Sequence, residues 1–221
     1  MREPFIVNIM HENPIEVPEI EQLFADLSHP NPYIQTQAFT AMVQYWPEES
    51  MSRLLGLLDQ QDVALRRASV RALGVFGEAA LLPLASLYSS SDDGTTRASC
   101  IKAYAQVASN YPGLPFPDES MQALQVALAD ESPVVAVAAV MALGQVGEQA
   151  TSILLQVIEG SNPALAVAAV NALAQISHPS VEHGLQALLD NEDTDSYVRE
   201  TVISALLRVQ DIKARQPQPY S

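Results

Sequence analysis

The chain has 221 residues, and 26 acidic residues against 11 Lys and Arg give it a formal net charge of −15. This balance excludes a bulk surface that binds nucleic acid, because phosphate contacts require an excess of cations. Apolar residues make up 48% of the chain, too many for a wholly disordered protein. Cys100 is the one cysteine, which excludes an internal disulfide and a Cys-rich metal site and indicates a reducing compartment.

The two segments that could direct the chain to a membrane are poorly suited to it. Residues 1–18 carry three Glu and three Pro and lack the apolar core of a signal peptide. Residues 160–181 are uncharged, but Pro163 and Pro179 interrupt them. The sequence therefore predicts a cytoplasmic protein with no membrane span.

A ten-residue pattern recurs along the chain. It reads LRRASVRALG at 65–74, VAVAAVMALG at 135–144 and LAVAAVNALA at 165–174, with looser copies at 96–105 and 198–207. One alanine of each copy serves as a ruler: Ala41, Ala72, Ala103, Ala142, Ala172 and Ala205. Their spacings of 31, 31, 39, 30 and 33 residues indicate a repeat of about 30 residues. The 30 alanines of the chain favour closely packed helices.

Each copy follows another amphipathic run, and Asp, Asn, Gly or Pro separates the two, as at helix ends. In chain order these first runs are residues 20–27, 51–58, 81–88, 121–128, 153–158 and 181–189. The expected units are about 20–46, 48–77, 78–110, 118–147, 148–177 and 179–210, between an N-terminal extension (1–19) and a flexible tail (211–221). A single unit cannot bury its apolar face, so the sequence predicts an all-α solenoid of six helix–turn–helix repeats, an alpha-alpha superhelix, rather than a plain helical bundle.

The segment 65–74, followed by Gly77-Glu78 and by the sequence LLPL at 81–84, resembles the HEAT-like repeat of phycobilin lyases of the E/F type. The resemblance covers about residues 20–208. Proteins of that family attach or remove linear tetrapyrroles on phycobiliproteins, the antenna proteins of cyanobacteria and red algae, and the attacking thiol belongs to the client. The same repeat also serves as a binding scaffold in many other proteins.

The resemblance implies a HEAT-repeat scaffold or chaperone in phycobiliprotein maturation or phycobilisome assembly. Such a chain would bind a phycobiliprotein client or an assembly factor, and it could form one subunit of a bilin lyase with a second HEAT-like subunit. It would hold no intrinsic cofactor, and a bilin would bind only transiently. The alternative is a non-catalytic adaptor for another client, such as an iron–sulfur cluster carrier.

The candidate site follows from helix geometry. On each second helix, the residue before the ruler alanine and the third residue after it share a face, and the resemblance implies that second helices line a concave surface. Together with Arg67, the candidate binding residues are Arg71, Lys102, Gln106, Met141, Gln145, Asn171, Gln175 and Arg208. Gln offers donors and acceptors without charge, and the cations could meet bilin propionates or acids of a partner. The alternative is an ordinary solvated helix face.

The charges are unevenly distributed. From Ala103 to Val198 there is no Lys or Arg, whereas the same stretch contains eleven Asp and Glu. We expect a mixed-charge end and a purely acidic region beyond it. That region would attract a basic partner, or its acids simply keep an Ala-rich surface soluble.

A second column of the repeat reads Gln35, Arg66, Arg97, Ala136, Ala166 and Arg199. The resemblance implies that each Arg pairs with an acid of the preceding turn and that these pairs form a ladder between repeats, for which Asp62, Asp92 or Asp93, and Asp195 are available.

The 39-residue spacing marks an insertion at residues 109–120, which contains three prolines. Asp118 is expected to cap the next helix. Tyr111, Leu114 and Phe116 either fold back onto the core or form a docking element on the surface.

Histidine and cysteine are the residues of this sequence that could supply metal-binding or nucleophilic chemistry. His178 and His183 are too few to define a metal site and suit capping or surface positions. Cys100 suits a small buried position, since no activating His accompanies it. No catalytic constellation is found, so the sequence leaves open whether the chain is an enzyme. Trp46 is expected to cover the solenoid end, and residues 5–7 form either an apolar hook or part of a disordered arm.

Overall fold

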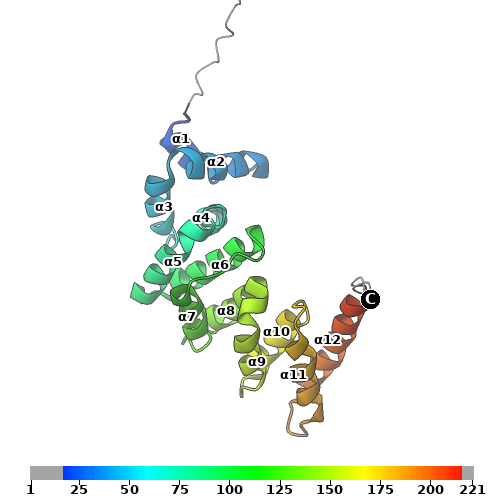
Figure 1. Ribbon diagram of the computed structural model, residues 1–221. Helices are drawn as coiled ribbons and strands as arrows, with labels where there is room; N and C mark the ends of the chain where they lie inside the picture. The colour runs from blue at the N-terminus through cyan, green and yellow to red at the C-terminus, as the bar shows by residue number, and fades with distance from the viewer. Residues whose placement is uncertain (1–16, 216–221) are drawn as a thin grey trace, which may run out of the picture.

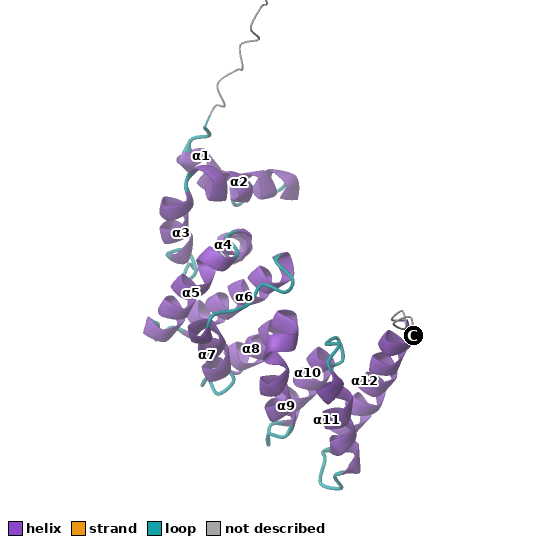
Figure 2. Ribbon diagram, viewed as in Figure 1, coloured by secondary structure: helices purple, strands orange, loops and turns teal. Residues whose placement is uncertain are grey.

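The computed structural model describes the backbone of residues 17–215 and the side chains of residues 17–211. Within this range the chain forms twelve α-helices and one short 3₁₀-helix, and it contains no strand. Successive helix pairs stack into a curved array (Figure 1), and only turns and loops connect them (Figure 2). The predicted all-α solenoid is confirmed.

The array has two layers (Figure 1). The outer layer contains the first helices: α1 (Ile20–Asp26), α3 (Pro47–Leu55), α5 (Glu78–Ser90), α7 (Asp118–Ala127), α9 (Thr151–Ile158) and α11 (Pro179–Asp190). The inner layer contains the second helices: α2 (Pro32–Tyr45), α4 (Val63–Val75), α6 (Gly94–Asn110), α8 (Pro133–Val146), α10 (Pro163–Leu173) and α12 (Ser196–Arg215). The 3₁₀-helix η1 (Gly147–Ala150) precedes α9. The inner layer lines the concave face of the arc.

Five of the six inner helices begin at the same kind of side-chain cap. The side chains of Asn31, Asp62, Asp93, Asn162 and Asp195 each accept a backbone N–H from the first turn of α2, α4, α6, α10 and α12, at 2.7–3.3 Å. Such a cap satisfies backbone donors that have no partner within the helix. The Asp and Asn residues of the turns therefore determine where these five helices start, whereas α8 follows Ser132, whose side chain makes no cap hydrogen bond.

The ruler alanines lie where inner helices pack on one another. Ala72, Ala103, Ala142 and Ala205 are fully buried. The glycine two residues after Ala142 brings α8 close to α10, since a Cβ on Gly144 would lie 2.8 Å from the Cβ of Ala172. The many alanines of the sequence therefore allow the inner helices of neighbouring repeats to pack closely.

Three local expectations meet different outcomes. Asp118 is the first residue of α7 and not its cap, because Pro117 occupies the cap position and makes no side-chain hydrogen bond. The helix α12 continues to Arg215, beyond the expected boundary at residue 210. The half-buried Trp46 donates its indole N–H to the carbonyl oxygen of Pro18 at 2.9 Å, so it fastens the chain that enters α1 onto the first repeat. Residues 1–16, with the proposed hook at residues 5–7, and residues 216–221 lie outside the described part of the chain.

Candidate functional site on the concave face

The candidate binding residues lie on the inner helices that line the concave face (Figure 1). Arg67, Arg71, Lys102, Met141, Gln145, Gln175 and Arg208 are exposed, and Gln106 and Asn171 are half-buried. The face is available for binding, although the role of these side chains stays a prediction.

The concave face begins with a cationic sector, defined here as Arg67 and Arg71 of α4 with Lys102 of α6. A guanidinium nitrogen of Arg71 donates to Oε1 of Gln35 on α2 at 2.6 Å, which links the first two inner helices and orients the Arg71 side chain. Arg67 and Lys102 are exposed. Carboxylates are the chemical partners that suit these cations.

Between α6 and α12 the concave face carries no charge. We call this part the neutral sector, formed by the concave faces of α8 and α10, two helices without a single charged residue. On α8, Val134 is 60% exposed, Val137 39% and Met141 64%, and their spacing of three and four residues places them on one face. A row of exposed apolar side chains on an inner helix is typical of a binding surface.

A cavity of about 330 Å³ joins the two sectors between α6 and α8. Its lining brings together four of the candidate residues, Lys102, Gln106, Met141 and Gln145, with Ala105, Ser109 and Ala138. The Gln106 amide also donates to Oδ1 of Asn110 at 3.0 Å. The cavity thus offers an apolar floor, two amides and one ammonium group.

Other candidate residues lie farther along the arc. Asn171 on α10 accepts a hydrogen bond from Arg208 of α12 at 2.8 Å, and the Gln175 amide donates to the carbonyl oxygen of Asn171 at 3.4 Å. The cations on α4 and Arg208 on α12 belong to opposite parts of the array (Figure 1). The nine candidate residues therefore form a band of separate groups along the concave face.

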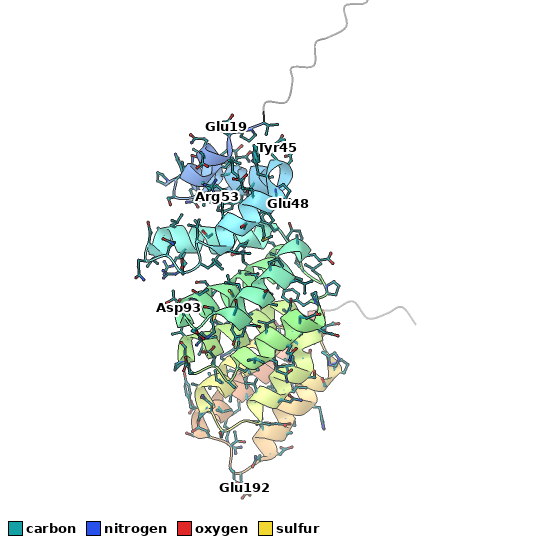
Figure 3. The ribbon with its side chains drawn as sticks, turned by 90° about the vertical axis from the view of Figure 1, so that its left-hand side faces the viewer. Glu19, Tyr45, Glu48, Arg53, Asp93 and Glu192 are labelled. Carbon is teal, nitrogen blue, oxygen red and sulfur yellow. The ribbon has the colours of Figure 1, made fainter. Side chains whose placement is uncertain are left out.

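The acids of the cation-free stretch lie away from the concave face. All eleven belong to outer helices, to η1 or to the turns and caps beside them, as Figure 3 illustrates for Glu192. In this stretch the acids lie outside α8 and α10 because the turns use Asp for capping, whereas these two inner helices use Ala for packing. The expected purely acidic region is thus confined to the outer layer and the edges, and its concave side is neutral.

The Arg column binds its own turn. The side chains of Gln35, Arg66 and Arg97 donate to the backbone carbonyl oxygens of His29, Gln60 and Ser91, each six residues earlier. Arg199 donates to the carbonyl oxygens of Leu189 and Asn191 at 2.5 and 2.6 Å. The expected pairing with Asp62, Asp93 or Asp195 is wrong, because these carboxylates accept helix N–H groups instead.

Two arginines form ion pairs that join neighbouring repeats. Arg53 of α3, labelled in Figure 3, binds Glu21 of α1 at 2.8 Å and lies over the Phe24 ring. Arg97 of α6 binds Asp130, in the turn after α7, at 2.7 Å and Glu131 at 3.1 Å. The Arg97 guanidinium holds the pKa of the Asp130 carboxyl below its usual value, despite partial burial.

Tyr88 of α5 extends this cluster. Its hydroxyl group donates to Asp130 at 3.3 Å, and burial, together with the nearby carboxylate, raises the pKa of Tyr88 to about 12. The sequence predicts a ladder between repeats but does not identify Asp130 as the partner of Arg97, because Asp130 resembles an ordinary turn residue.

The insertion folds back onto the core. Phe116 is buried beside Tyr104, with ring centroids 5.7 Å apart. The backbone N–H and C=O of Phe116 are both bound by the amide of Gln149, at 2.9 and 2.8 Å. Tyr111 remains partly exposed, but its hydroxyl donates to the carbonyl oxygen of Val75 at 2.5 Å. The alternative of a freely projecting docking element is excluded for Phe116.

Cys100 and His178, candidates for nucleophilic and metal chemistry, occupy structural positions. Cys100 is fully buried, and burial raises the pKa of its thiol to about 12. His178 caps α11 by accepting the N–H of Ser180, as expected, whereas His183 is exposed. Residues 17–215 contain no cluster of three or more His, Cys, Asp or Glu that could hold a metal ion. The burial of Cys100 also removes it as a surface ligand for a shared iron–sulfur cluster.

One helical run, Pro133–Ile158, has the length and apolar composition of a membrane span, but half of its most apolar window is buried inside the solenoid. It consists of α8, η1 and α9, and Gly147 breaks it with a φ of +80°. The run therefore has the character of packed core helices.

Comparison with known proteins agrees with the repeat architecture. The family model for HEAT repeats matches residues 20–105 and 151–217. The X-ray structure of E. coli YibA has a TM-score of 0.50 at 15% identity, covering 92% of this chain and 78% of that chain. This likeness concerns the fold alone.

Two curated relatives cover most of the chain. Phycocyanin operon protein Z of Pseudanabaena tenuis (strain PCC 7409), described as uncharacterized, is 41% identical over 192 residues, 86% of this chain and 95% of the relative. The bilin biosynthesis protein CpeZ of Synechococcus sp. (strain WH8020) is 37% identical over 181 residues, 79% of this chain and 97% of the relative. The chain therefore belongs to the HEAT-repeat proteins and, among them, to the family of phycocyanin operon protein Z and CpeZ.

Proposed function

We propose that this protein is a HEAT-repeat scaffold or chaperone in phycobiliprotein maturation, and that its concave face binds a phycobiliprotein client. The observation that carries the proposal is the polarity of that face: a cationic sector on α4 and α6 adjoins a neutral, apolar sector on α8 and α10. The similarity to a bilin biosynthesis protein over nearly the whole length of that relative supports the process.

The face selects a client of matching polarity. An apolar helix surface of the client would cover Val134, Val137 and Met141, because burying their exposed apolar area is favourable. An acidic group at one end of that surface would meet Arg71 and Lys102. Opposite charges at one end and apolar contacts at the other would fix the orientation of the client.

A bilin is the proposed transient ligand, with no cofactor belonging to the chain itself. The cavity between α6 and α8 has about 330 Å³, at the lower end of the range for small-molecule sites, roughly 300–1,000 Å³. It suits one part of a linear tetrapyrrole, with a propionate near Lys102, while the client covers the rest. The proposed action is positioning, because the attacking thiol would come from the client. A second HEAT-like subunit is the proposed additional partner, and the cytoplasm is the proposed compartment.

Binding of purified apo-phycobiliprotein subunits, with and without free bilin, tests this proposal. We expect Lys102→Glu and Met141→Arg each to weaken client binding at least tenfold. Gln156→Arg, the same cationic replacement at an exposed position of the outer helix α9, is the matched control and should bind like wild type. The absorbance spectrum of the complex reports whether a bilin is included.

Two results would contradict different parts of the proposal. Equal binding by Met141→Arg and wild type would place the client elsewhere on the molecule. A wild-type protein that binds neither apo-subunits nor bilin would contradict the proposed function altogether.

A further inference from the structure

A second hollow lies in the outer layer, between α5 and α7, on the side of the array that faces the viewer in Figure 3. It has about 880 Å³. The two helices belong to the third and fourth repeats and pack against each other. This groove is separate from the concave face, because the inner helices that line the concave face lie in the other layer (Figure 1).

Small residues keep the groove open. Ala85, Ser86 and Ser89 line it from α5, and Ala123 lines it from α7. Two large apolar side chains stand at its walls with much of their surface in water: Leu82 is 52% exposed and Val126 is 55% exposed. The groove therefore offers an apolar lining that no side chain of the described residues covers.

The corresponding space between α9 and α11 is smaller, a cavity of about 430 Å³ that Gly184 helps to line. The side chain of Leu155 packs onto Gly184 so closely that a Cβ there would lie 2.4 Å from Leu155 Cδ2. Leu155 thus narrows the space between α9 and α11, and the α5–α7 groove is the larger of the two.

The rim of the groove is acidic. Neither α5 nor α7 contains Lys or Arg. Glu119 and Glu131 lie on the rim, and the side chain of Glu131 is 84% exposed. The one cation of the lining, Arg97, is already bound by both Asp130 and Glu131. The local charge is therefore negative.

We propose that this groove docks an amphipathic helix of a partner protein, with an apolar ridge that enters the groove and Lys or Arg beside it. The apolar ridge covers Leu82 and Val126, and the flanking cations meet Glu119 and Glu131. Long-range attraction between opposite charges accelerates such docking and makes it sensitive to salt.

Two other occupants fit less well. Residues 1–16 of the chain contain three Glu and one Arg, which does not complement an acidic rim. A second copy brings a net charge of −15. This surface does not depend on the proposed client site, so the protein would hold two partners on opposite layers.

Fluorescence anisotropy with a labelled 18-residue helical peptide tests the proposal. The probe carries a Leu ridge flanked by Lys, and the matched peptide carries Glu in place of each Lys. We expect saturable binding of the Lys peptide alone, weakened by salt. Val126→Arg should weaken it at least tenfold, because it places a cation in the groove at an exposed position. Met141→Arg, the same kind of change on the concave face, should leave it unchanged.

A second variant and a mapping step exclude a general effect of charge. Ser86→Trp fills the groove without changing the charge and should also weaken binding at least tenfold, with circular dichroism reporting that the variant is folded. A photoreactive residue in the Leu ridge should crosslink to α5 or α7. Crosslinks to α8 or α10, equal binding by Val126→Arg, or no binding of the Lys peptide would each overturn the proposal. Met141→Arg separates the two sites. If this variant loses apo-subunit binding but still binds the Lys peptide, the concave site is affected and the groove is not.

Discussion

Arg97 and Asp130 form a two-pronged ion pair across the boundary between the third and fourth repeats. Nε and a terminal nitrogen of the guanidinium approach the two carboxylate oxygens at 2.7 and 3.0 Å. The Asp130 side chain is 5% exposed and also accepts the backbone N–H of Ser132 at 2.9 Å. One carboxylate therefore joins two repeats and organises the turn before α8.

Removing this carboxylate should destabilise the solenoid. We expect Asp130→Ala to lower the midpoint of thermal unfolding by about 5 °C, because it leaves the guanidinium without its main partner and the turn without an acceptor. Glu131→Ala, which removes the exposed second partner, is the matched control and should change the midpoint little. Circular dichroism melting measures both, and equal effects would contradict the role given to Asp130.

The same ion pair should make the stability of the fold depend on pH in the acidic range. The folded protein lowers the pKa of Asp130, so its contribution to stability is fully present above the ordinary value of about 4. The contribution is lost as the pH falls through the lowered pKa. The difference in melting temperature between wild type and Asp130→Asn should therefore be largest at neutral pH and shrink toward pH 2. A difference that grows on acidification would show that the sign is wrong.

Gly144 should tolerate no side chain. A Cβ there would lie 2.8 Å from the Cβ of Ala172, so Gly144→Ala must push α8 away from α10 and should cost about 1–3 kcal/mol. Gly94→Ala is the control, because its Cβ meets Ser132 at an ordinary 3.7 Å. Chemical denaturation of the two variants measures the contrast. A stable Gly144→Ala protein would mean that the inner helices can separate without loss.

Cys100 should be unreactive in the folded protein. Its side chain is fully buried and the pKa of its thiol is raised to about 12, so the reactive thiolate is scarce at pH 8. We expect a disulfide reagent to modify it more than about a hundredfold more slowly than in guanidinium-unfolded protein. Rapid modification of the native protein would show that α6 opens readily.

Phe116 and Tyr111 should differ in their contributions to stability. Phe116→Ala removes a buried ring beside Tyr104 and should cost about 3–5 kcal/mol. Tyr111→Phe removes only the hydroxyl that binds the Val75 carbonyl oxygen and should cost about 1 kcal/mol. Urea denaturation of the two variants tests the ranking, and a larger loss for Tyr111→Phe would reverse it.

The fold was accessible from sequence because local signals repeat. Ala72, Ala103 and Ala142 recur at the contact between inner helices, and Asp62 and Asp93 recur at helix starts. The candidate site was accessible in part: spacing placed Lys102 and Met141 on the same face, but not around a shared cavity. Such a cavity depends on the depth to which neighbouring side chains pack, which periodicity does not encode.

Other features could be identified only from the three-dimensional structure. The sequence shows that residues 103–198 lack cations, but only the layers reveal that the acids avoid α8 and α10. The groove between α5 and α7 depends on side-chain volumes in two repeats at once. Asp130 could be recognised as a partner of Arg97 only through contact across repeats, since 33 residues separate the two.

The insertion also determines how the solenoid would unfold. In repeat arrays each unit ordinarily contacts only its neighbours, so the ends open independently of the middle. Here the insertion at residues 109–120 contacts α4 through Tyr111 and η1 through Gln149. These contacts connect the second repeat to the start of the fifth. The central repeats should therefore exchange their amide hydrogens as one cooperative block. The first and last helix pairs, outside this clamp, remain the parts free to adjust their curvature around a bound protein.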